Sequence, residues 1–241
     1  MENNKRILIT GANGGIGVEL VNYLLGSKQY DIVCQYRGNK DKLDSVLMGH
    51  GIESDAVCIR AELTNEDDVQ ILKAKAGNVW GIVNMAGASS NAMSWKMPTG
   101  EFQTIINDNL FSAFMCINEF IPGMRASNGG RIINISSVAA FKGIIGASHY
   151  CAAKAGIIGL TKALAAELVN KNITVNALAL GYFEYGMINQ IPLDIRNEIK
   201  ESIPMRRFGR IEELGGMIRF LLSDESSYIT GQAIHINGGL Y

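Results

Sequence analysis

Short apolar runs alternate with longer stretches of helical period from one end of the chain to the other. Several of these runs are apolar on successive residues, as in strands that are buried on both faces. The expected strands are Arg6–Thr10, Asp31–Tyr36, Asp55–Arg60, Gly81–Met85, Arg131–Ser136, Thr174–Leu180 and Ala233–Ile236. The expected helices lie near Ile16–Leu25, Glu66–Ala74, Gly100–Arg125, Tyr150–Lys171 and Ile211–Leu222. This alternation implies right-handed crossovers and predicts an α/β fold, a doubly wound parallel sheet of about seven strands that binds ligands at the carboxyl ends of its strands.

The chain of 241 residues holds no internal repeat, low-complexity tract or linker rich in Pro, Gly or Ser, so we expect a single domain over residues 1–241. Hydrophobic residues make up 47% and charged residues 19%, a balance that suits a packed core and excludes a disordered chain. The net charge of −1 and the lack of a long basic run argue against a nucleic-acid partner.

Signals for targeting, membrane insertion and metal binding are missing from the sequence. The first apolar string, Ile7–Ile9, is too short for a signal peptide or a membrane span, which predicts a cytoplasmic protein without a membrane partner. The cysteines Cys34, Cys58, Cys116 and Cys151 form no CxxC pair and have no His-rich neighbourhood. We interpret them as reduced thiols and expect neither a disulfide framework nor a metal site.

The first expected strand leads into a glycine-rich loop, Thr10–Gly17 (TGANGGIG), and a helix follows at once. Gly11, Gly15 and Gly17 allow the backbone to turn tightly and to approach a pyrophosphate, while the helix start offers free N–H groups and a positive dipole end. Ordinary strand–helix turns also contain such glycines. The position of this loop in the first βα unit of an alternating chain favours dinucleotide binding.

The end of the second expected strand bears on the choice of dinucleotide. Enzymes that prefer NAD usually place a carboxylate there to hold the ribose hydroxyls, but this chain has no acid before Asp41. Arg37 is suited to a 2′-phosphate, because its planar guanidinium forms charge-assisted hydrogen bonds with phosphate. The sequence therefore predicts NADP(H) as the preferred cofactor, with NAD(H) as the second choice, unless Arg37 is only an exposed loop residue.

A tyrosine and a lysine supply the candidate chemistry. Tyr150 and Lys154 are four residues apart at the start of an expected helix, so their side chains share one face. Tyrosine titrates near 10, and we expect the neighbouring ammonium and a positively charged cofactor to lower the pKa of Tyr150. Taken alone, the pair would equally suit a tyrosine at the edge of the core and a solvated lysine.

Together these features resemble the short-chain dehydrogenase/reductase family. The TGxxxGxG loop, the segment Asn84–Gly87 (NMAG) and the spacing of Ser137, Tyr150 and Lys154 match its motifs. The resemblance covers essentially the whole chain. It implies a single-domain Rossmann-type enzyme that transfers hydride between a nicotinamide and a carbonyl or alcohol.

The resemblance also assigns roles to individual residues. Tyr150 would exchange a proton with the substrate oxygen, Ser137 would hydrogen-bond that oxygen, and Lys154 would hydrogen-bond the nicotinamide ribose. Asn109, aligned through the pattern N-L-x-x-x-F, would hold a water that connects the lysine to solvent; the alternative is an asparagine that caps or kinks a helix. The implied cofactor site consists of Gly11, Asn13, Gly14, Gly15, Ile16, Gly17, Arg37, Glu62, Leu63, Asn84, Ala86, Gly87, Tyr150, Lys154, Gly181 and Phe183.

Two segments, Ile203–Glu213 and Leu221–Gly239, look closest to bacterial 3-oxoacyl-(acyl-carrier-protein) reductases. The resemblance implies an NADPH-dependent reductase of a 3-oxoacyl thioester that acts in fatty-acid or polyketide-type biosynthesis. The substrate would be either a small molecule or an acyl group bound to a carrier protein, and the enzyme would be a homotetramer. A dehydrogenase of a sugar, polyol or other secondary alcohol is the alternative, and a non-catalytic cofactor sensor is a third. An enoyl reductase is disfavoured, because that branch typically separates its tyrosine and lysine by more than YxxxK.

The segment after Gly181 departs from the family pattern. Leu180 and Tyr185 stand where a proline and a threonine are usual at the nicotinamide pocket. We expect residues 182–208 to form a mobile lid over cofactor and substrate, loosened by these two replacements. Apolar residues in the lid favour an acyl or aromatic substrate, unless they only pack the segment onto the core: Met187, Ile188, Ile191, Ile203 and Met205.

The basic patch with which carrier-protein reductases dock their partner is only partly present. Lys171 fits one basic position, whereas Asn128 stands where an arginine is common. Arg125 lies nearby in the sequence and could replace that arginine. The sequence thus leaves open whether the substrate is attached to a carrier protein.

Overall fold

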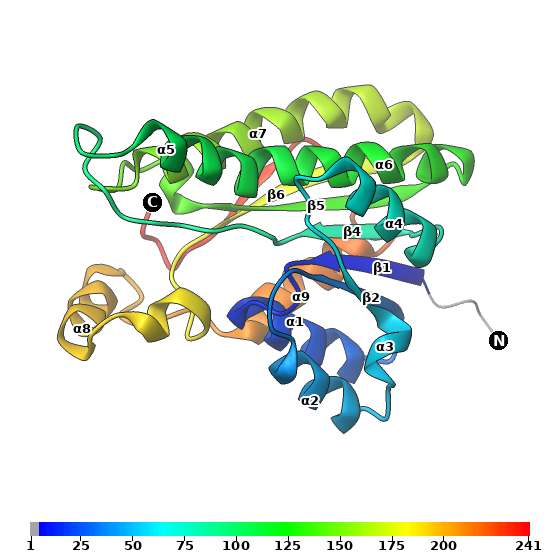
Figure 1. The fold of residues 1–241 in the computed structure, drawn as a ribbon, viewed down its shortest axis with the longest axis horizontal. Helices are drawn as coiled ribbons and strands as arrows, with labels where there is room; N and C mark the ends of the chain where they lie inside the picture. The colour runs from blue at the N-terminus through cyan, green and yellow to red at the C-terminus, as the bar shows by residue number, and fades with distance from the viewer. Residues whose placement is uncertain (1–4) are drawn as a thin grey trace.

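The computed structural model describes residues 5–241, except for the side chain of Met187, and it contains one parallel sheet (Figure 1). The strands are β1 (Lys5–Thr10), β2 (Tyr30–Tyr36), β3 (Cys58–Arg60), β4 (Gly81–Asn84), β5 (Gly130–Ser137), β6 (Ile173–Leu180) and β7 (Ala233–Ile236). They lie in the order β3-β2-β1-β4-β5-β6-β7, and each neighbouring pair is parallel. The predicted doubly wound α/β sheet is confirmed.

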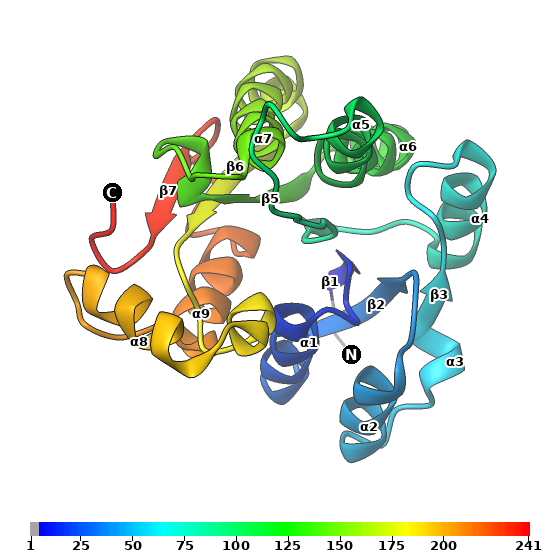
Figure 2. The ribbon, with the colours of Figure 1, turned by 60° about the vertical axis from the view of Figure 1, so that its left-hand side comes forward.

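Helices cover both faces of the sheet (Figure 2). One face carries α1 (Gly15–Gly26), α2 (Asp41–Gly49) and α9 (Ile211–Leu222), and the other carries α4 (Glu66–Ala76), α5 (Thr99–Ile106), α6 (Ser112–Ala126) and α7 (Ser148–Leu168). The central strands are therefore buried on both sides. In β1, Ile7 and Ile9 belong to the core cluster on one face and Leu8 to the cluster on the other, as the alternation of strand side chains requires.

Three elements differ from the expectation. The third strand begins only at Cys58, because Ser54–Val57 form a short helix, α3. Helix α2 was not expected from its largely polar sequence, yet Leu43 and Leu47, one helical turn apart, are fully buried against the core. Helix α8 (Leu193–Ser202) lies inside the segment that we expected to form a lid, and it has no buried residue.

The long helix expected over Gly100–Arg125 is interrupted. Between α5 and α6, the residues Asn107–Phe111 form a π-helix, a feature that often marks functional sites. The side chain of Asn109 donates hydrogen bonds to the carbonyl of Ile105 at 2.9 Å and to that of Ala88 at 2.7 Å. The asparagine thus holds the widened turn against the chain that follows β4.

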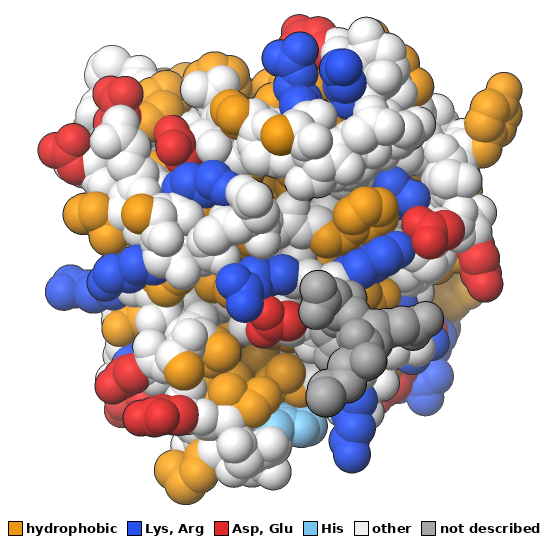
Figure 3. Space-filling view, turned by 90° about the vertical axis from the view of Figure 1, so that its right-hand side faces the viewer, with side chains coloured by type: hydrophobic (Ala, Val, Ile, Leu, Met, Phe, Trp, Pro, Cys, Tyr) orange, Lys and Arg blue, Asp and Glu red, His pale blue; other side chains and the backbone are white. Residues whose placement is uncertain are grey.

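The amino ends of the strands form a face where basic and acidic side chains are interspersed (Figure 3). Ion pairs there join Lys5 to Asp224 at 3.2 Å, Arg131 to Asp224 at 3.3 Å and Arg6 to Asp31 at 2.6 Å. Within residues 5–241, no helix has the length and apolar character needed to cross a membrane.

Candidate active site

An open cavity of about 910 Å³ lies at the opposite edge of the sheet, where the strands end. The β1–α1 loop, the ends of β2, β4, β5 and β6, and the first turns of α7 surround it. Most of the expected site residues line this cavity: Gly11, Asn13, Gly14, Gly15, Ile16, Gly17, Arg37, Glu62, Leu63, Ala86, Gly87, Asn109, Ser137, Tyr150, Lys154 and Gly181. One cavity therefore unites the expected cofactor and catalytic residues.

Two expected residues do not line the cavity. Asn84 is buried between strands, and its amide donates to Asn134 Oδ1 at 2.9 Å. Phe183 is only 3% exposed and packs so closely on Gly209 that a Cβ there would lie 2.8 Å from the ring. Both side chains contribute to packing, so any cofactor contact from these positions would have to come from their main chains.

The glycine loop has the geometry of a phosphate cradle. Gly11 has a φ of +63°, and a Cβ at this position would lie 2.8 Å from the backbone of Ala86. A Cβ at Gly17 would lie 2.5 Å from the carbonyl oxygen of Gly11. Helix α1 begins at Gly15 and has no acidic residue in its first turn. Its free N–H groups and the positive end of its dipole are therefore not neutralised by a carboxylate from that turn. These residues fit a dinucleotide pyrophosphate.

A glutamine holds the loop on the sheet. Gln35 is buried at the end of β2; its Oε1 accepts from the N–H of Gly11 at 2.8 Å, and its Nε2 donates to the carbonyl of Ala61 at 2.7 Å. Thr10 Oγ1 accepts from the N–H groups of Met85 and Ala86 at 3.0 and 3.1 Å. The carboxyl ends of β1, β2, β3 and β4 are therefore tied together beneath the cavity.

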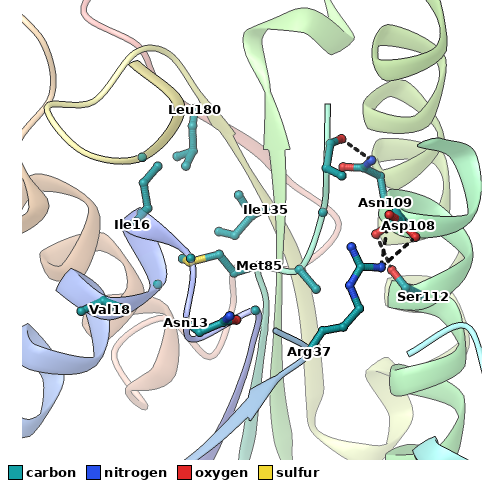
Figure 4. A pocket seen from close by; sticks show the side chains of 18 of the residues that line it. Asn13, Ile16, Val18, Arg37, Met85, Asp108, Asn109, Ser112, Ile135 and Leu180 are labelled. Atoms are coloured by element: carbon teal, nitrogen blue, oxygen red, sulfur yellow. Dashed lines mark hydrogen bonds and ion pairs between the residues drawn. The ribbon is translucent and has the colours of Figure 1, made fainter. Parts of the chain in front are cut away.

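Arg37 extends from the end of β2 across the cavity towards Asp108 on the π-helix (Figure 4). Its Nη1 lies 3.3 Å from Glu62 Oε2 and 3.4 Å from Asp108 Oδ2, and its side chain is 57% exposed. Two carboxylates thus hold the guanidinium beside the cavity, and its role towards a 2′-phosphate stays a prediction. Lys42 also lines this end, a basic residue that the sequence reasoning did not include.

Ser137 and Tyr150 meet at the end of β5. A side-chain hydrogen bond joins them, and Ser137 Oγ also accepts from the N–H of Ala139 at 3.1 Å. Ser136 instead donates to the carbonyl of Lys154 at 2.8 Å and fastens α7 to the sheet. Ser137, not Ser136, is therefore the serine that contacts the tyrosine.

Lys154 lies one turn after Tyr150 on α7, and its Nζ is 5.5 Å from the centre of the tyrosine ring. The side chain is 5% exposed, and its Nζ donates to the carbonyl of Ile135 at 3.0 Å. Burial of the ammonium lowers the pKa of Lys154 to about 8. The lysine can therefore release and regain a proton near neutral pH.

The protein's own groups do not produce the expected lowering of the pKa of Tyr150. Burial raises the pKa of the phenol above its ordinary value, and the hydrogen bond with Ser137 offsets only part of this effect. A desolvated phenol favours its neutral form, and the ammonium of Lys154 does not outweigh that cost. Tyr150 therefore holds its proton at neutral pH, as a proton donor must.

Asn109 places an acceptor beside the lysine. The residue is 1% exposed; its amide nitrogen donates to the carbonyls of Ile105 and Ala88, while its Oδ1 is buried without a partner among the described residues. A Cβ at Gly87 would meet both Asn109 Oδ1 and Lys154 Nζ, the latter at 3.5 Å. The two polar atoms therefore border the same space next to Gly87. The hydrogen bonds of Asn109 in the widened turn fit a structural asparagine, whereas its role in holding a water stays a prediction.

Known proteins resemble this chain over nearly its whole length. A family model described as "Enoyl-(Acyl carrier protein) reductase" matches residues 11–241. The chain is 38% identical over 245 residues to the 3-oxoacyl-(acyl-carrier-protein) reductase FabG of Staphylococcus epidermidis, covering 99% of both chains. The chain belongs to the short-chain dehydrogenase/reductase family. Other members include FabG of Staphylococcus aureus, 36% identical over 100% of both chains, and nodulation protein G of Azospirillum brasilense, 37% identical over 98% of both.

Membership of the short-chain dehydrogenase/reductase family makes the protein an NAD(P)-dependent oxidoreductase. The Tyr150–Lys154 pair on successive turns is the arrangement expected of its ketoreductases. The non-catalytic alternative has no support, because the residues expected to transfer protons are present and line one cavity.

The two departures from the short-chain dehydrogenase/reductase pattern border the cavity. Leu180 lies on the apolar side with Ile16 and Ile135 (Figure 4). Tyr185 also lines the cavity and precedes the 3₁₀ turn Gly186–Gln190. That turn rests on the glycine loop, since a Cβ at Gly15 would lie 2.5 Å from Gly186 Cα. The sequence reasoning missed Gly186, although a glycine directly after Tyr185 was a visible signal.

The apolar residues of the lid segment mostly pack against one another. Ile188 and Ile203 form a small buried cluster with Phe208, and Ile191 packs against it. Met205 is 62% exposed, and the side chain of Met187 lies outside the described part of the structure. Packing of the segment therefore explains Ile188, Ile191 and Ile203, and they are no evidence for an acyl substrate.

Proposed function

We propose that this protein is a cytoplasmic ketoreductase that uses NADPH in preference to NADH to reduce the ketone of a 3-oxoacyl thioester. The observation that carries the proposal is the convergence of Ser137, Tyr150, Lys154 and Asn109 on the cavity that also contains the glycine loop. The full-length relatives from Staphylococcus, which are named 3-oxoacyl-(acyl-carrier-protein) reductases, supply the substrate class.

When bound, the reduced nicotinamide supplies the hydride for the ketone carbon. Ser137 hydrogen-bonds the ketone oxygen, and Tyr150 donates its phenolic proton to that oxygen as negative charge develops. The hydrogen bond between Ser137 and Tyr150 already places both hydroxyls at one point of the cavity. The chain thus contributes a proton and its position to the reaction.

Lys154 and Asn109 would return a proton to the tyrosine. The buried ammonium has a pKa of about 8 and therefore gives up its proton at little cost near neutral pH. Asn109 Oδ1 and Lys154 Nζ border the same space beside Gly87, where a water could accept from one and donate to the other. This supports a proton path from solvent through Asn109 to Lys154.

An acyl substrate is supported by apolar side chains on the loops that leave the strand ends. Trp95, Ile145 and Met205 are 78%, 84% and 62% exposed, and they follow β4, β5 and β6 in turn. The N–H of Ala92 donates to the carbonyl of Gly146 at 2.9 Å, which holds the first two loops side by side. These three residues follow the strand ends that border the cavity but are not among its lining residues, and exposed apolar side chains there would suit a hydrocarbon chain better than a sugar.

Attachment of the substrate to a carrier protein would require a neighbouring subunit. Arg125 lies at the carboxyl end of α6, just before β5. Lys171 ends the short turn after α7, just before β6. They are thus at the amino edge of the sheet, opposite the cavity of their own chain. Docking through these residues would serve the cavity of another copy, so the carrier proposal depends on the homotetramer that we also propose.

The test is a panel of substrates: 3-oxoacyl thioesters on coenzyme A and on carrier protein, free β-keto esters, sugars and secondary alcohols. Each is assayed with NADPH and with NADH by nicotinamide absorbance, and the mass of the protein in solution is measured by light scattering. The proposal predicts the highest kcat/KM for a 3-oxoacyl thioester with NADPH. A sugar or simple alcohol as the best substrate would contradict it.

A further inference from the structure

Two cysteines lie opposite each other outside the residues used in the proposed reaction. Cys34 on β2 and Cys58 on β3 are partners in the parallel register of these strands. Their side chains therefore point to the same face of the sheet, and the two thiols are close enough to shift each other's pKa. Both are free thiols, as are Cys116 and Cys151.

The two thiols differ in environment. Cys34 is fully buried in the core, whereas Cys58 is partly exposed at its edge. The ammonium of Lys40 lies beside Cys58, held by Ser54 Oγ at 2.9 Å and Asp55 Oδ1 at 3.0 Å. The pKa of Cys58 is lowered, chiefly by the neighbouring Cys34 thiol and further by Ser54 and Lys40; burial and the carboxylate of Asp44, which also pairs with Lys40 at 3.1 Å, act against this lowering. A partly exposed thiol next to a cation is the reactive type.

The strand geometry allows these sulfurs to be joined. Neighbouring strands are about 4.8 Å apart, and disulfides span Cα separations of roughly 4.4–6.8 Å. Direct partners of a parallel pair keep their Cβ atoms farther apart than the most relaxed disulfides do, so the bond would be somewhat strained. Strained disulfides have more oxidising potentials and are the readily reduced kind.

We propose that Cys58 and Cys34 form a reversible oxidation site for hydroperoxides. The Cys58 thiolate attacks the terminal oxygen of the hydroperoxide; the O–O bond breaks, and Cys58 becomes a sulfenic acid while the alcohol or water leaves. The sulfur of Cys34 then attacks the Cys58 sulfur and displaces the hydroxyl group as water. With hydrogen peroxide, two thiols and one peroxide yield one disulfide and two waters.

The disulfide would form close to the support of the cofactor loop. Cys34 directly precedes Gln35, whose side chain bridges Gly11 and Ala61. Drawing β3 towards β2 would shift this bridge, and with it the glycine loop. We therefore expect the oxidised protein to have a KM for NADPH raised several-fold with little change in kcat. This kinetic effect rests on the proposed function, whereas the formation of the disulfide does not.

The experiment treats the full chain, in a Cys151→Ala background, with hydrogen peroxide, because Cys151 is partly exposed next to Tyr150. Trypsin places Cys34 in a peptide of residues 29–37 and Cys58 in a peptide of residues 43–60. The expected result is a linked pair of these peptides that dithiothreitol separates, together with the raised KM. Circular dichroism confirms that each variant is folded.

Two variants test the order of the steps. In Cys34→Ala, Cys58 should accumulate as a sulfenic acid that dimedone traps, and in Cys58→Ala, Cys34 should stay reduced. The proposal is overturned if peroxide gives no linked peptides, or if Cys58 proceeds to a sulfinic acid without linking to Cys34. Linked peptides with an unchanged KM would confirm the oxidation site and overturn its effect on the cofactor loop.

Discussion

Replacing the buried lysine with a hydrophobic residue should abolish turnover and, near neutral pH, stabilise the fold. Lys154 has its pKa lowered from 10.5 to about 8 by burial alone. Since a tenfold change in proton affinity is worth about 1.4 kcal/mol, the charged lysine costs the folded protein about 3 kcal/mol. Lys154→Met removes this cost and keeps most of the apolar stem. It also loses the hydrogen bond to Ile135, worth roughly 1–2 kcal/mol, so the net gain at pH 7 is about 1–2 kcal/mol.

The pH dependence of this gain is the sharper test. The unfolded lysine titrates near 10.5 and the folded one near 8, so the unfolded chain binds more protons between these values. The stability of the wild type therefore rises with pH through this window, because the free-energy cost of the buried ammonium is complete below pH 8 and disappears above pH 10.5. Between pH 7 and pH 9.5, the advantage of Lys154→Met should fall by about 2 kcal/mol.

Urea unfolding of both proteins at pH 7 and pH 9.5, at one protein concentration, measures this difference. Lys162→Met is the matched control, because Lys162 is exposed on the same helix and its replacement removes no buried ammonium. If Lys154→Met changes stability by the same amount at pH 7 and pH 9.5, the lysine does not carry the burial cost, and our account of its proton exchange is refuted.

Three further predictions concern the cofactor end and the lid. Arg37→Ala should reduce the ratio of kcat/KM for NADPH to kcat/KM for NADH by roughly ten- to a hundredfold, because a charged hydrogen bond to the 2′-phosphate is lost. An unchanged ratio would exclude Arg37 as the phosphate ligand, and Lys42→Ala tests the other basic residue in the cavity. Gly15→Ala should raise the Kd of both cofactors, because its Cβ would displace Gly186, whereas Gly26→Ala, with open space at its Cβ, should bind normally. Hydrogen exchange should show weak protection of residues 182–208 that rises when cofactor binds; equally strong protection in both states would show that this segment is fixed.

Apolar runs located the strands well, because a strand between two helical layers buries the side chains on both of its faces and these are therefore mostly apolar. Every residue of β6 is buried, and its expected bounds were one residue short. The start of β3 could not be placed in this way, since Ser54–Val57 contains too few apolar residues to separate a strand from a turn of helix. Leu43 and Leu47, four residues apart, were a signal for α2 that the polar residues around them obscured.

In the site, local motifs identified residues but not which of their atoms face the cavity. Asn84 and Phe183 match motif positions, yet tertiary packing turns both side chains away. Within the π-helix, Asn109 hydrogen-bonds the carbonyl of Ala88, a contact between separate segments that periodicity does not reveal. The pairing of Cys34 with Cys58 likewise depends on the register of two strands.

The most direct test of the central claim is the turnover of Tyr150→Phe with NADPH and a 3-oxoacyl thioester. The variant should fold and bind cofactor as the wild type does but lose about 10²–10⁴-fold in kcat, the usual contribution of a positioned acid. Tyr182→Phe is the matched control, because this second phenol lies close enough to influence Tyr150 but does not line the cavity. Wild-type turnover in Tyr150→Phe, or the loss appearing in Tyr182→Phe instead, would contradict the assignment of Tyr150 as the proton donor.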